Sequence, residues 1–376
     1  MLSSYRSNIM RIILTGGGTG GHIFPLVSVA KKLKEKLGAN AELLYIGSGA
    51  KIEKEVMEKE GIATKNIVSG KMRRYFSLQN FVDLFRIPVG IIQSLWILVN
   101  FMPDVVFSKG GYACVPIVIA AWIYRIPVLI HESDAIAGLA NRFSGKLAKR
   151  VAISYPSAKK YFSPNKIAMT GNPVRKELVG ADSLLIRNNF SLIESRPIIL
   201  VLGGSQGSQV INDSIIKILP QLLKRAQIIH QTGELNYENV IHKAAEYGIK
   251  SGRDGYIPVK FLEPKLLGSA YAASDLIISR AGANSIAEIA ANRKPAIFIP
   301  LSNSANDHQR GNAYDIAEIG GALVLEESNL GSNIFLERIE KMLNEKEFSN
   351  SMVEKIVTFY HPNADEIIAN GILEIV

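Results

Sequence analysis

Residues 11–22 read Arg-Ile-Ile-Leu-Thr-Gly-Gly-Gly-Thr-Gly-Gly-His, and this stretch decides the fold. The apolar run Ile12–Leu14 predicts a short buried strand, which ends in the glycine-rich turn Gly16–Gly21. A helical pattern of apolar positions follows at Pro25–Leu37. Glycine lets a backbone approach a ligand closely, and a helix start offers unpaired N–H groups and a positive dipole end. The stretch therefore predicts a strand, an anion-binding turn and a helix.

Strand-like and helix-like segments alternate through the rest of the first half. Further strands are expected at Glu42–Ile46, Asp104–Phe107 and Val128–Ile130, with helices at Lys51–Glu60 and around Val115–Tyr124. Apolar strands that alternate with amphipathic helices indicate an α/β fold, in which helices cover both faces of a parallel sheet.

The same order restarts near residue 197. A strand at Ile198–Leu202 leads into a glycine turn, Gly203–Gly207, and then into a helix at Val210–Leu223. Further strands are expected at Ile228–His230, Leu276–Ile278 and Ala296–Ile299. A chain of 376 residues exceeds one ordinary core, so we expect two doubly wound, Rossmann-like domains.

Glycine and proline interrupt the pattern at Gly171-Asn172-Pro173, which places the domain boundary there. We expect a poorly ordered tail at 1–9, a first domain at 10–172 and a second at 173–360. A capped helix is expected within 361–376. Periodicity leaves its packing partner open, and we assign it to the first domain.

Positive charge is concentrated in the first half. Residues 1–175 contain 24 Lys+Arg and 10 Asp+Glu, a net +14, whereas residues 176–376 contain 19 and 24, a net −5. Such asymmetry indicates that one domain faces an anionic surface, either lipid headgroups or nucleic acid, or else that the charge serves solubility. The single cysteine, Cys114, fits a reducing cytoplasm, and residues 1–9 lack the apolar core of a secretory signal.

The segment Lys71–Phe101 combines basic, aromatic and aliphatic residues. Its apolar part, Ile87–Met102, is short for a membrane span of about 20 residues, and Gln93 and Asn100 interrupt it. The mixture is typical of a surface that lies among lipid headgroups. It is also compatible with a site for single-stranded nucleic acid or with a core helix that has a basic rim. The residues predicted to face a membrane are Arg73, Arg74, Tyr75, Phe76, Leu78, Phe81 and Phe85.

A third helix start, Arg280–Ser285, follows another predicted strand. Three such turns, each at the start of a helix, favour a ligand that contains phosphate, because helix N-termini bind anions. Asn284 or Ser285 is expected to cap the third helix. The first turn matches the dinucleotide pattern, but the next strand ends at Ser48 without the acid that NAD requires. His22 stands where a P-loop needs lysine, which argues against that class of NTPase. No metal-ligand spacing occurs, so neither metal nor cofactor is expected.

Two side chains next to these turns are candidates for chemistry. His22 follows the first turn at the mouth of a helix, where a neutral imidazole is able to act as a general base, or simply caps the helix. Glu288 lies one turn into the third helix and is placed either to hold a ribose diol or to remain solvated. His308 and Gln309 follow Pro300 in a loop that is expected to face the ligand.

Together these residues resemble the MurG family of glycosyltransferases, which add N-acetylglucosamine to the lipid-linked muramoyl-pentapeptide precursor of peptidoglycan. The resemblance extends over nearly the whole chain, from Ile12 to Ile375. The matching motifs, in the family's order, are Gly17–His22 with Pro25, Lys109–Tyr112, His131-Glu132, Gly138–Asn141, Thr170–Arg175, Gly203–Gly207, His230–Gly233, Arg280–Ala283, Ala287–Ile289, Asp307–Gln309 and Asn312-Ala313.

The resemblance implies a GT-B architecture, with two Rossmann-like domains facing a central cleft. It implies an amino-terminal domain that takes the lipid acceptor and a carboxy-terminal domain that holds UDP-N-acetylglucosamine. Carried over by motif, the nucleotide-sugar contacts are Thr19, Gly20, Gly21, Asp134, Arg175, Ser205, Leu262, Ala283, Asn284, Ser285, Ile286, Ala287, Glu288 and Gln309. Glu288 would hold the ribose, Gln309 would touch the sugar, and His22 would be the base.

One residue departs from the family's pattern. Many members have Asn where this chain has Asp134, in His131-Glu132-Ser133-Asp134. A carboxylate accepts hydrogen bonds from sugar hydroxyls but cannot donate as an amide does, so the role of this position is left open.

The expected reaction inverts the sugar's configuration: the C4 hydroxyl of the muramoyl sugar attacks UDP-N-acetylglucosamine and forms a β1→4 bond. This converts lipid I to lipid II in peptidoglycan synthesis, a step tied to cell shape and division, by a peripheral enzyme at the cytoplasmic face of the plasma membrane. The expected partners are therefore the donor, the lipid acceptor and an anionic membrane surface, with no nucleic acid. The alternatives are a glycolipid transferase with another acceptor, such as diacylglycerol, and a nucleotide-sugar-binding protein without catalysis.

Overall fold

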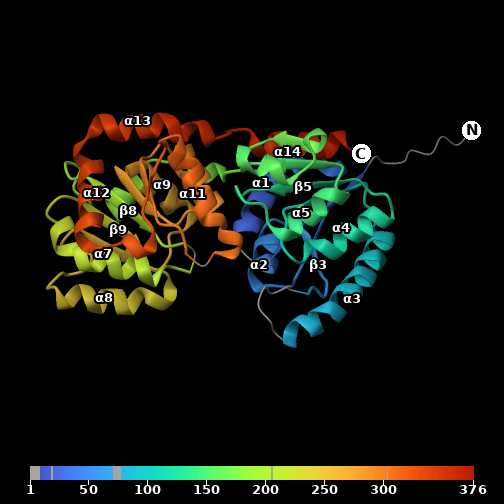
Figure 1. The fold of residues 1–376 in the computed structure, drawn as a ribbon, viewed down its shortest axis with the longest axis horizontal. Coiled ribbons are helices and arrows are strands. Elements are labelled where there is room, and N and C mark those ends of the chain that lie inside the picture. The colour runs from blue at the N-terminus through green and yellow to red at the C-terminus, as the bar shows by residue number, and fades with distance from the viewer. Residues whose placement is uncertain (1–8, 18–19, 71–77, 205, 303) are drawn as a thin grey trace, which may run out of the picture. The chain divides into compact units, whose positions relative to one another are not determined.

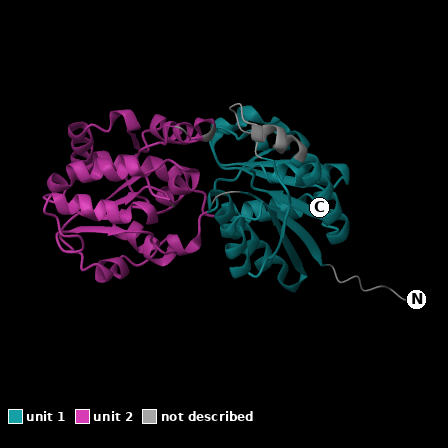
Figure 2. Cartoon of the chain, turned by 90° about the horizontal axis from the view of Figure 1, so that it is seen from below, with its two compact units in different colours: residues 1–173, 363–376 teal, residues 174–362 magenta. Residues whose placement is uncertain are grey.

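The computed structural model describes residues 9–17, 20–70, 78–204, 206–302 and 304–376, and the side chains of 78–85 and 305 lie outside the description. The predicted tail at 1–9 falls almost wholly outside it, as do Thr19, Ser205 and the stretch Arg73–Phe76. The chain forms two compact units (Figure 2), unit 1 from residues 1–173 and 363–376 and unit 2 from residues 174–362.

Unit 1 is built on a parallel sheet whose strand order is β3-β2-β1-β4-β5-β6-β7 (Figure 1). The order reverses beside β1, as in a doubly wound fold, because the chain first winds outward to β3 and then returns to the other side. The strands are β1 (Met10–Thr15), β2 (Ala41–Gly47), β3 (Ala63–Asn66), β4 (Val105–Ser108), β5 (Val128–Glu132), β6 (Arg150–Ile153) and β7 (Ile167–Met169).

Helices cover the sheet of unit 1 because the central strands are apolar on both faces. Ile12, Ile13 and Leu14 of β1 are all fully buried. The helices are α1 (Gly20–Leu37), α2 (Lys51–Lys59), α3 (Leu78–Phe101), α4 (Cys114–Ile123), α5 (Leu139–Leu147) and α14 (Ala364–Glu374). No helix among the described residues is both long enough and apolar enough to cross a membrane.

The last helix, α14, packs against α1 although more than 300 residues separate them in the sequence. Its buried face, which includes Ile368 and Ile372, joins the same apolar core as Leu26 and Leu33 of α1. Lys36 and Glu366 form a salt bridge of 2.9 Å at the rim of this contact. The carboxy-terminal helix is therefore part of unit 1. Its packing partner, which periodicity could not identify, is α1.

Unit 2 repeats the architecture with the strand order β10-β9-β8-β11-β12-β13, all parallel. Its strands are β8 (Ile198–Leu202), β9 (Gln227–Gln231), β10 (Tyr256–Val259), β11 (Leu276–Ser279), β12 (Ala296–Phe298) and β13 (Leu323–Val324). Its helices are α6 (Leu184–Asn189), α7 (Gln209–Leu222), α8 (Tyr237–Glu246), α9 (Pro264–Ala273), α10 (Ala283–Ala291), α11 (His308–Glu318), α12 (Ser332–Asn344) and α13 (Lys346–Ile356). Two doubly wound α/β units are thus present, as the repeated strand–turn–helix pattern predicted.

The glycine turn after β8 is shaped by close backbone packing. Gly207 has φ +77°, and a Cβ there would collide with the Thr232 carbonyl at the end of β9. Gly233 has φ +83° and lies against Gln206 in the same way. The two turns therefore touch through backbone alone, and any side chain would separate them.

We expect Gly207→Ala to destabilise unit 2 by about 3 kcal/mol or more, because the left-handed conformation costs a non-glycine residue about 1–2 kcal/mol and the collision adds to it. The matched control is Gly248→Ala, since Gly248 has φ +73° but open space where a Cβ would lie. Urea unfolding of both variants measures the difference. Equal losses would show that the backbone contact at Gly207 carries no extra energy.

Candidate functional site

In unit 1 the first glycine turn lies at the carboxyl end of β1, against the turn that follows β4. The Gly17 N–H donates to the Gly110 carbonyl at 3.3 Å, and a Cβ on Gly111, which has φ +93°, would lie 3.1 Å from the Gly17 oxygen. The Tyr45 hydroxyl donates to the Gly16 carbonyl. Two turns thus present backbone at the edge of the sheet where ligands of open α/β folds bind.

His22 lies in the first turn of α1, next to this glycine turn. A Cβ on Gly16 would be 3.6 Å from the His22 Cβ, so the imidazole starts beside the backbone that would face a diphosphate. Gly20 and Gly21 begin the same helix, so their N–H groups belong to its positive end. The structure places these three residues in the first turn of α1, whereas Thr19 lies outside the described residues.

The turn after β5 carries Asp134 and is organised by the buried carboxylate of Glu132. One Glu132 oxygen accepts from the Asp134 N–H at 3.0 Å, and the other accepts from the Gly138 N–H at 3.1 Å and the Asn141 side-chain amide at 3.0 Å. Burial raises the pKa of Glu132 to about 7, with a further rise from Asp134, while these hydrogen bonds and the Lys109 charge oppose it. Asp134 itself is half-buried at the same sheet edge as His22.

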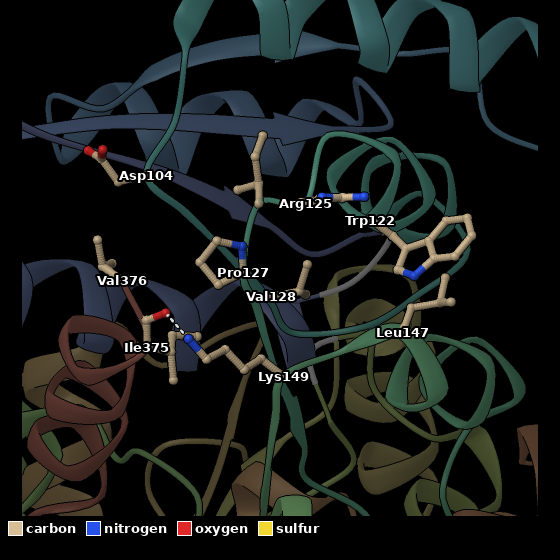
Figure 3. Close-up of a pocket in the computed structure, with 10 residues that line it drawn as sticks. Asp104, Trp122, Arg125, Pro127, Val128, Leu147, Lys149, Ile375 and Val376 are labelled. Carbon is tan, nitrogen blue, oxygen red and sulfur yellow. Dashed lines mark hydrogen bonds between the residues drawn. The ribbon is translucent and has the colours of Figure 1, made fainter.

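Cavities at the two edges of this sheet differ in what lines them. One of about 740 Å³ lies near the carboxyl ends of β2 and β3, and its lining combines apolar residues such as Ile67 and Val68 with polar ones such as Asn66, Arg86 and Tyr112. Another, of about 440 Å³, lies at the amino ends of β5 and β6 beside the last residues of α14 (Figure 3). There Lys149 donates to the Ile375 carbonyl at 2.7 Å. Only the first of these two cavities lies at the end of the sheet where ligands of such folds bind.

In unit 2 one guanidinium, that of Arg280, ties three loops together. It donates to the Ser208 hydroxyl at 2.6 Å, to the Ile299 carbonyl at 3.1 Å and to Glu327 at 2.6 Å. Ser208 caps α7 through the Ile211 N–H, so the glycine turn after β8 is fixed by the same contact. Arg280 was noted in the sequence only as part of a motif, and its role becomes visible through these partners.

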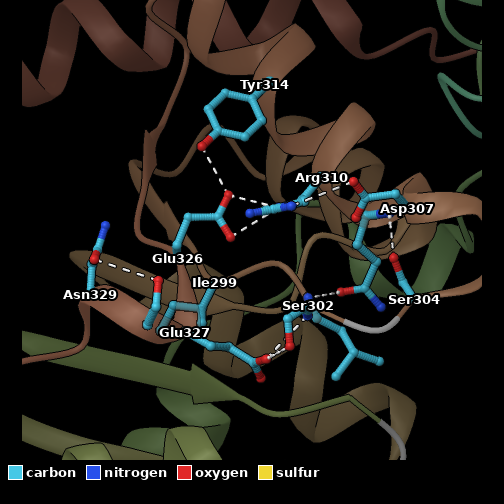
Figure 4. A network of polar contacts seen from close by, with 12 residues as sticks. Ile299, Ser302, Ser304, Asp307, Arg310, Tyr314, Glu326, Glu327 and Asn329 are labelled. Carbon is cyan, nitrogen blue, oxygen red and sulfur yellow. Dashed lines mark hydrogen bonds and ion pairs between the residues drawn. The ribbon is translucent and has the colours of Figure 1, made fainter.

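Glu327 continues this network toward Ser302, in the loop that precedes α11 (Figure 4). Its second oxygen accepts from the Ser302 backbone N–H at 3.1 Å and from the Ser302 hydroxyl. Burial alone would raise the pKa of Glu327, but hydrogen bonds from Ser302 and Arg280 outweigh it and hold the pKa below its usual value. Sequence reasoning missed Glu327, because a glutamate at the start of a short 3-10 helix carries no pattern.

The prediction that His308 and Gln309 lie in a loop is wrong, because they are the first two residues of α11. The loop that precedes this helix orients the Gln309 side chain. Its Oε1 accepts from the Leu301 N–H at 3.0 Å, and its backbone N–H donates to the Ser304 hydroxyl at 3.4 Å. Beside it, Glu326 binds Arg310 at 3.0 Å and accepts from the Tyr314 hydroxyl at 2.9 Å (Figure 4). Because the Leu301 N–H holds the side-chain oxygen of Gln309, the orientation of the side-chain NH₂ group of Gln309 is also fixed.

Glu288 is a buried carboxylate held from two sides. Arg175 donates to one oxygen at 3.1 Å and the Tyr271 hydroxyl donates to the other at 3.1 Å. Burial raises the pKa of Glu288, and Arg175 and Tyr271 act against that rise. The solvated-helix alternative for Glu288 is therefore wrong, because the residue is only 9% exposed and carries an ion pair.

The helix that contains Glu288, α10, begins differently from the expectation. Its N-cap is Gly282, so the prediction that Asn284 or Ser285 caps it is wrong, and no described side chain hydrogen-bonds as a cap there. Both residues lie instead inside the first turn, half-buried, beside the buried Ala283, Ile286 and Ala287. Backbone N–H groups of this turn are therefore the donors available to an anion.

Leu262, also predicted as a contact, follows β10 in unit 2. It is buried, and its N–H donates to the Gln231 side chain at 3.0 Å. Arg175, Leu262, the start of α10 and Gln309 all belong to unit 2, whereas Ser205 lies outside the described residues. Among the described residues, no group of three or more His, Cys, Asp or Glu is arranged to hold a metal ion.

Comparison with known protein families matches both units. A model of the glycosyltransferase family 28 N-terminal domain matches residues 12–153, and a model of the family's C-terminal domain matches residues 198–367. The chain belongs to glycosyltransferase family 28. This family 28 chain is therefore a glycosyltransferase, and its two Rossmann-like domains are those of the GT-B architecture.

Individual relatives agree with the family assignment. A protein of Clostridium perfringens, named UDP-N-acetylglucosamine–N-acetylmuramyl-(pentapeptide) pyrophosphoryl-undecaprenol N-acetylglucosamine transferase, is 40% identical over 91% of this family 28 chain and 93% of its own length. The crystal structure of Acinetobacter baumannii MurG superposes with a TM-score of 0.76 at 26% identity, covering 97% of this chain and 99% of that one. A UDP-GlcNAc 2-epimerase from Neisseria meningitidis, bound to UDP-GlcNAc, shares the fold with a TM-score of 0.70 at 16% identity, over 97% of this chain and 100% of its own.

We expect Arg280→Met to destabilise unit 2 of this family 28 enzyme by about 3 kcal/mol, because removing one partner leaves the Glu327 charge uncompensated in a mostly buried place. The control is Arg310→Met, which breaks an ion pair whose arginine is 43% exposed and should cost much less. Urea unfolding at about pH 7 compares the two variants. Equal losses of unfolding free energy in the two variants would show that Arg280 is no more important to stability than the exposed Arg310.

Proposed function

We propose that this enzyme transfers N-acetylglucosamine from UDP-N-acetylglucosamine to the C4 hydroxyl of undecaprenyl-diphosphate-linked N-acetylmuramoyl-pentapeptide, which converts lipid I to lipid II. The observation that carries the proposal is the match along both domains to relatives named for this reaction, at 40% identity over 91% of the chain. The fold alone would not suffice, since UDP-GlcNAc epimerases share it.

Unit 2 is the proposed donor site. The N-terminal turn of α10 offers backbone N–H groups and a positive helix end to the diphosphate. Glu288, already oriented by Arg175 and Tyr271, accepts hydrogen bonds from the ribose hydroxyls. Gln309 directs its amide to the sugar, because its carbonyl oxygen is occupied by the Leu301 N–H.

Unit 1 is the proposed acceptor site. Residues Thr19–Gly21 face the diphosphate and the reacting sugar, and Asp134 accepts a hydroxyl of the donor sugar. The cavity that contains Arg86 and Tyr112 has a mixed polar and apolar lining and lies at the carboxyl ends of β2 and β3, the end of the sheet where ligands of such folds bind. The proposed base, His22, lies beside that turn.

In the proposed reaction, His22 removes the proton of the acceptor C4 hydroxyl, and the oxygen attacks the anomeric carbon from the face opposite the nucleotide. The bond from that carbon to the diphosphate oxygen breaks, and UDP leaves with the electron pair. The helix N-termini and turn amides stabilise the charge that develops on the departing diphosphate.

We expect His22→Ala to lower kcat by about 10²–10⁴-fold, the contribution typical of a general base, while the affinity for UDP remains nearly unchanged. The complementary variant is Glu288→Gln, which should weaken UDP binding because a neutral amide is a poorer acceptor for the ribose. Release of labelled UDP and calorimetric titration with UDP measure the two effects. Full activity in His22→Ala would exclude this residue as the base.

The acceptor is tested by substrate exchange. Purified enzyme is incubated with labelled UDP-N-acetylglucosamine and either a short-chain muramoyl-pentapeptide lipid or diacylglycerol. We expect a disaccharide lipid only with the first. Transfer to diacylglycerol instead would identify a different glycolipid transferase, and saturable binding without transfer to either lipid would indicate a binding protein.

The proposed location is the cytoplasmic face of the plasma membrane, with α3 as the contacting element. The side chains of Leu78, Phe81 and Phe85 lie outside the description, but the same helix continues with an exposed apolar stripe. The stripe is Val89, Ile92, Trp96 and Val99, whose spacing places it on one helix face.

Helix α4, which packs against α3, also ends in exposed apolar residues. Trp122, Ile123 and Tyr124 at the end of α4 are exposed, and Arg86 and Arg125 are exposed cations on the same two segments. Aromatic and basic side chains together suit an anionic bilayer surface.

We expect Trp96→Glu to lower binding to anionic phospholipid vesicles about tenfold or more, because Trp96 is 72% exposed and its burial in the interface is worth about 2 kcal/mol. The control is Leu235→Glu, which adds the same charge to a 93% exposed apolar residue of unit 2. Co-sedimentation with vesicles measures binding. Equal losses would indicate that only net charge matters.

A further inference from the structure

Lys109 is a buried lysine to which the proposed reaction gives no task. It follows β4 directly, and its backbone N–H donates to the Thr15 carbonyl at 2.8 Å. The side chain is 1% exposed, and its ammonium nitrogen has no hydrogen-bond partner among the described residues. An ammonium without hydrogen bonds in the interior is costly unless opposite charges lie near it.

The opposite charges come from the neighbouring strand. β4 and β5 are paired in parallel with Ser108 opposite Ile130, so Lys109 leaves the sheet beside His131 and Glu132. Asn141 links the two turns: its amide donates to Glu132, and a Cβ on Gly110 would lie only 2.7 Å from the same side chain. Lys109 is thereby held close to the turn that carries Asp134.

Electrostatics agree with this placement. Burial lowers the pKa of Lys109 to about 8, and the charges of Glu132 and Asp134 limit the fall. The Lys109 charge in turn lowers the pKa of Glu132 and, after burial, that of His131, whereas Asp134 raises the pKa of Glu132. These four residues are the titrating groups that interact at this point.

We propose that Lys109 is a positioning residue for donor-sugar recognition, whose buried ammonium balances the Glu132 carboxylate in the turn that carries Asp134. The inference rests on the proposed function, because it assigns Asp134 to the donor sugar. Lys109 touches no substrate in this account. It acts by keeping Glu132 ionised, so that Glu132 accepts the Asp134, Gly138 and Asn141 hydrogen bonds that shape the turn.

The consequence is an energetic coupling between positions 109 and 134. Without the lysine, the buried Glu132 carboxylate keeps only the like charge of Asp134 beside it, so the pKa of Glu132 rises further and the turn loses part of its ionised acceptor. Replacing Asp134 by Asn removes the like charge that raises the pKa of Glu132. The second substitution should therefore compensate for the first.

The test is a double-mutant cycle of Lys109→Met, Asp134→Asn and both together in the full-length enzyme. We expect Lys109→Met to lower kcat/KM for UDP-N-acetylglucosamine about tenfold near neutral pH, mainly through KM, and to move the acid limb of the pH profile to higher pH. Adding Asp134→Asn should restore kcat/KM to within about threefold of the Asp134→Asn single variant. UDP affinity should stay the same throughout.

Lys149→Met is the matched control, since Lys149 lies at the amino ends of the strands and donates to Ile375 instead of facing a carboxylate. It should leave kcat/KM and the pH profile unchanged. Melting temperatures of all variants separate a positioning role from simple loss of the fold. Independent, multiplicative effects at 109 and 134, or a loss at 109 that Asp134→Asn does not relieve, would overturn the proposal.

The cycle is repeated with calorimetric binding of UDP-N-acetylglucosamine and of UDP. If the wild-type enzyme binds the nucleotide sugar but transfers nothing to the muramoyl lipid, the proposed function fails, and the coupling is still read from the difference between the two affinities. If the effects of the two substitutions on that affinity difference are not additive, the role of Lys109 is supported. Additive effects contradict it.

Discussion

Both units depend on a close contact between glycine turns at the carboxyl ends of their central strands, where backbone atoms meet without intervening side chains. In unit 1 the turns after β1 and β4 touch through Gly17, Gly110 and Gly111, and in unit 2 those after β8 and β9 touch through Gly207 and Gly233. A parallel sheet brings these strand ends to one edge, and only glycine permits the approach. Helix N-termini then present N–H groups at that edge, which suits a diphosphate better than any single side chain would.

Around these turns, charge is placed differently in the two units. Unit 2 surrounds its loops with satisfied ion pairs, in which Arg280 binds Glu327 and Arg175 binds Glu288 at 10–16% side-chain exposure. Unit 1 instead holds an ammonium without hydrogen bonds among the described residues, Lys109, near Glu132 and Asp134. Paired charges with good geometry mainly fix loop conformation, whereas an unpaired buried cation exerts its effect through the pKa values of its neighbours.

Much of the fold could be predicted, because long apolar strands and glycine turns carry a local signal. Short edge strands such as β3, Ala63–Asn66, were missed, since a polar sequence at the edge of a sheet has no apolar alternation. The cap of α10 was misplaced within its first turn: cap preferences favour Asn and Ser, but the strand β11 ends so that Gly282 takes the position. Arg280 and Glu327 form a pair across 47 residues, a distance at which sequence spacing says nothing about contact.

Periodicity and glycine placement predicted the two strand–turn–helix units and the motifs that carry the family resemblance, because each of these is a local property of the chain. The folded chain was needed to show that α14 packs on α1, that Glu288 is buried between Arg175 and Tyr271, and that Lys109 lies beside the Asp134 turn. The physical reason is that burial and charge pairing depend on which strands and helices become neighbours, and those neighbours are distant along the chain.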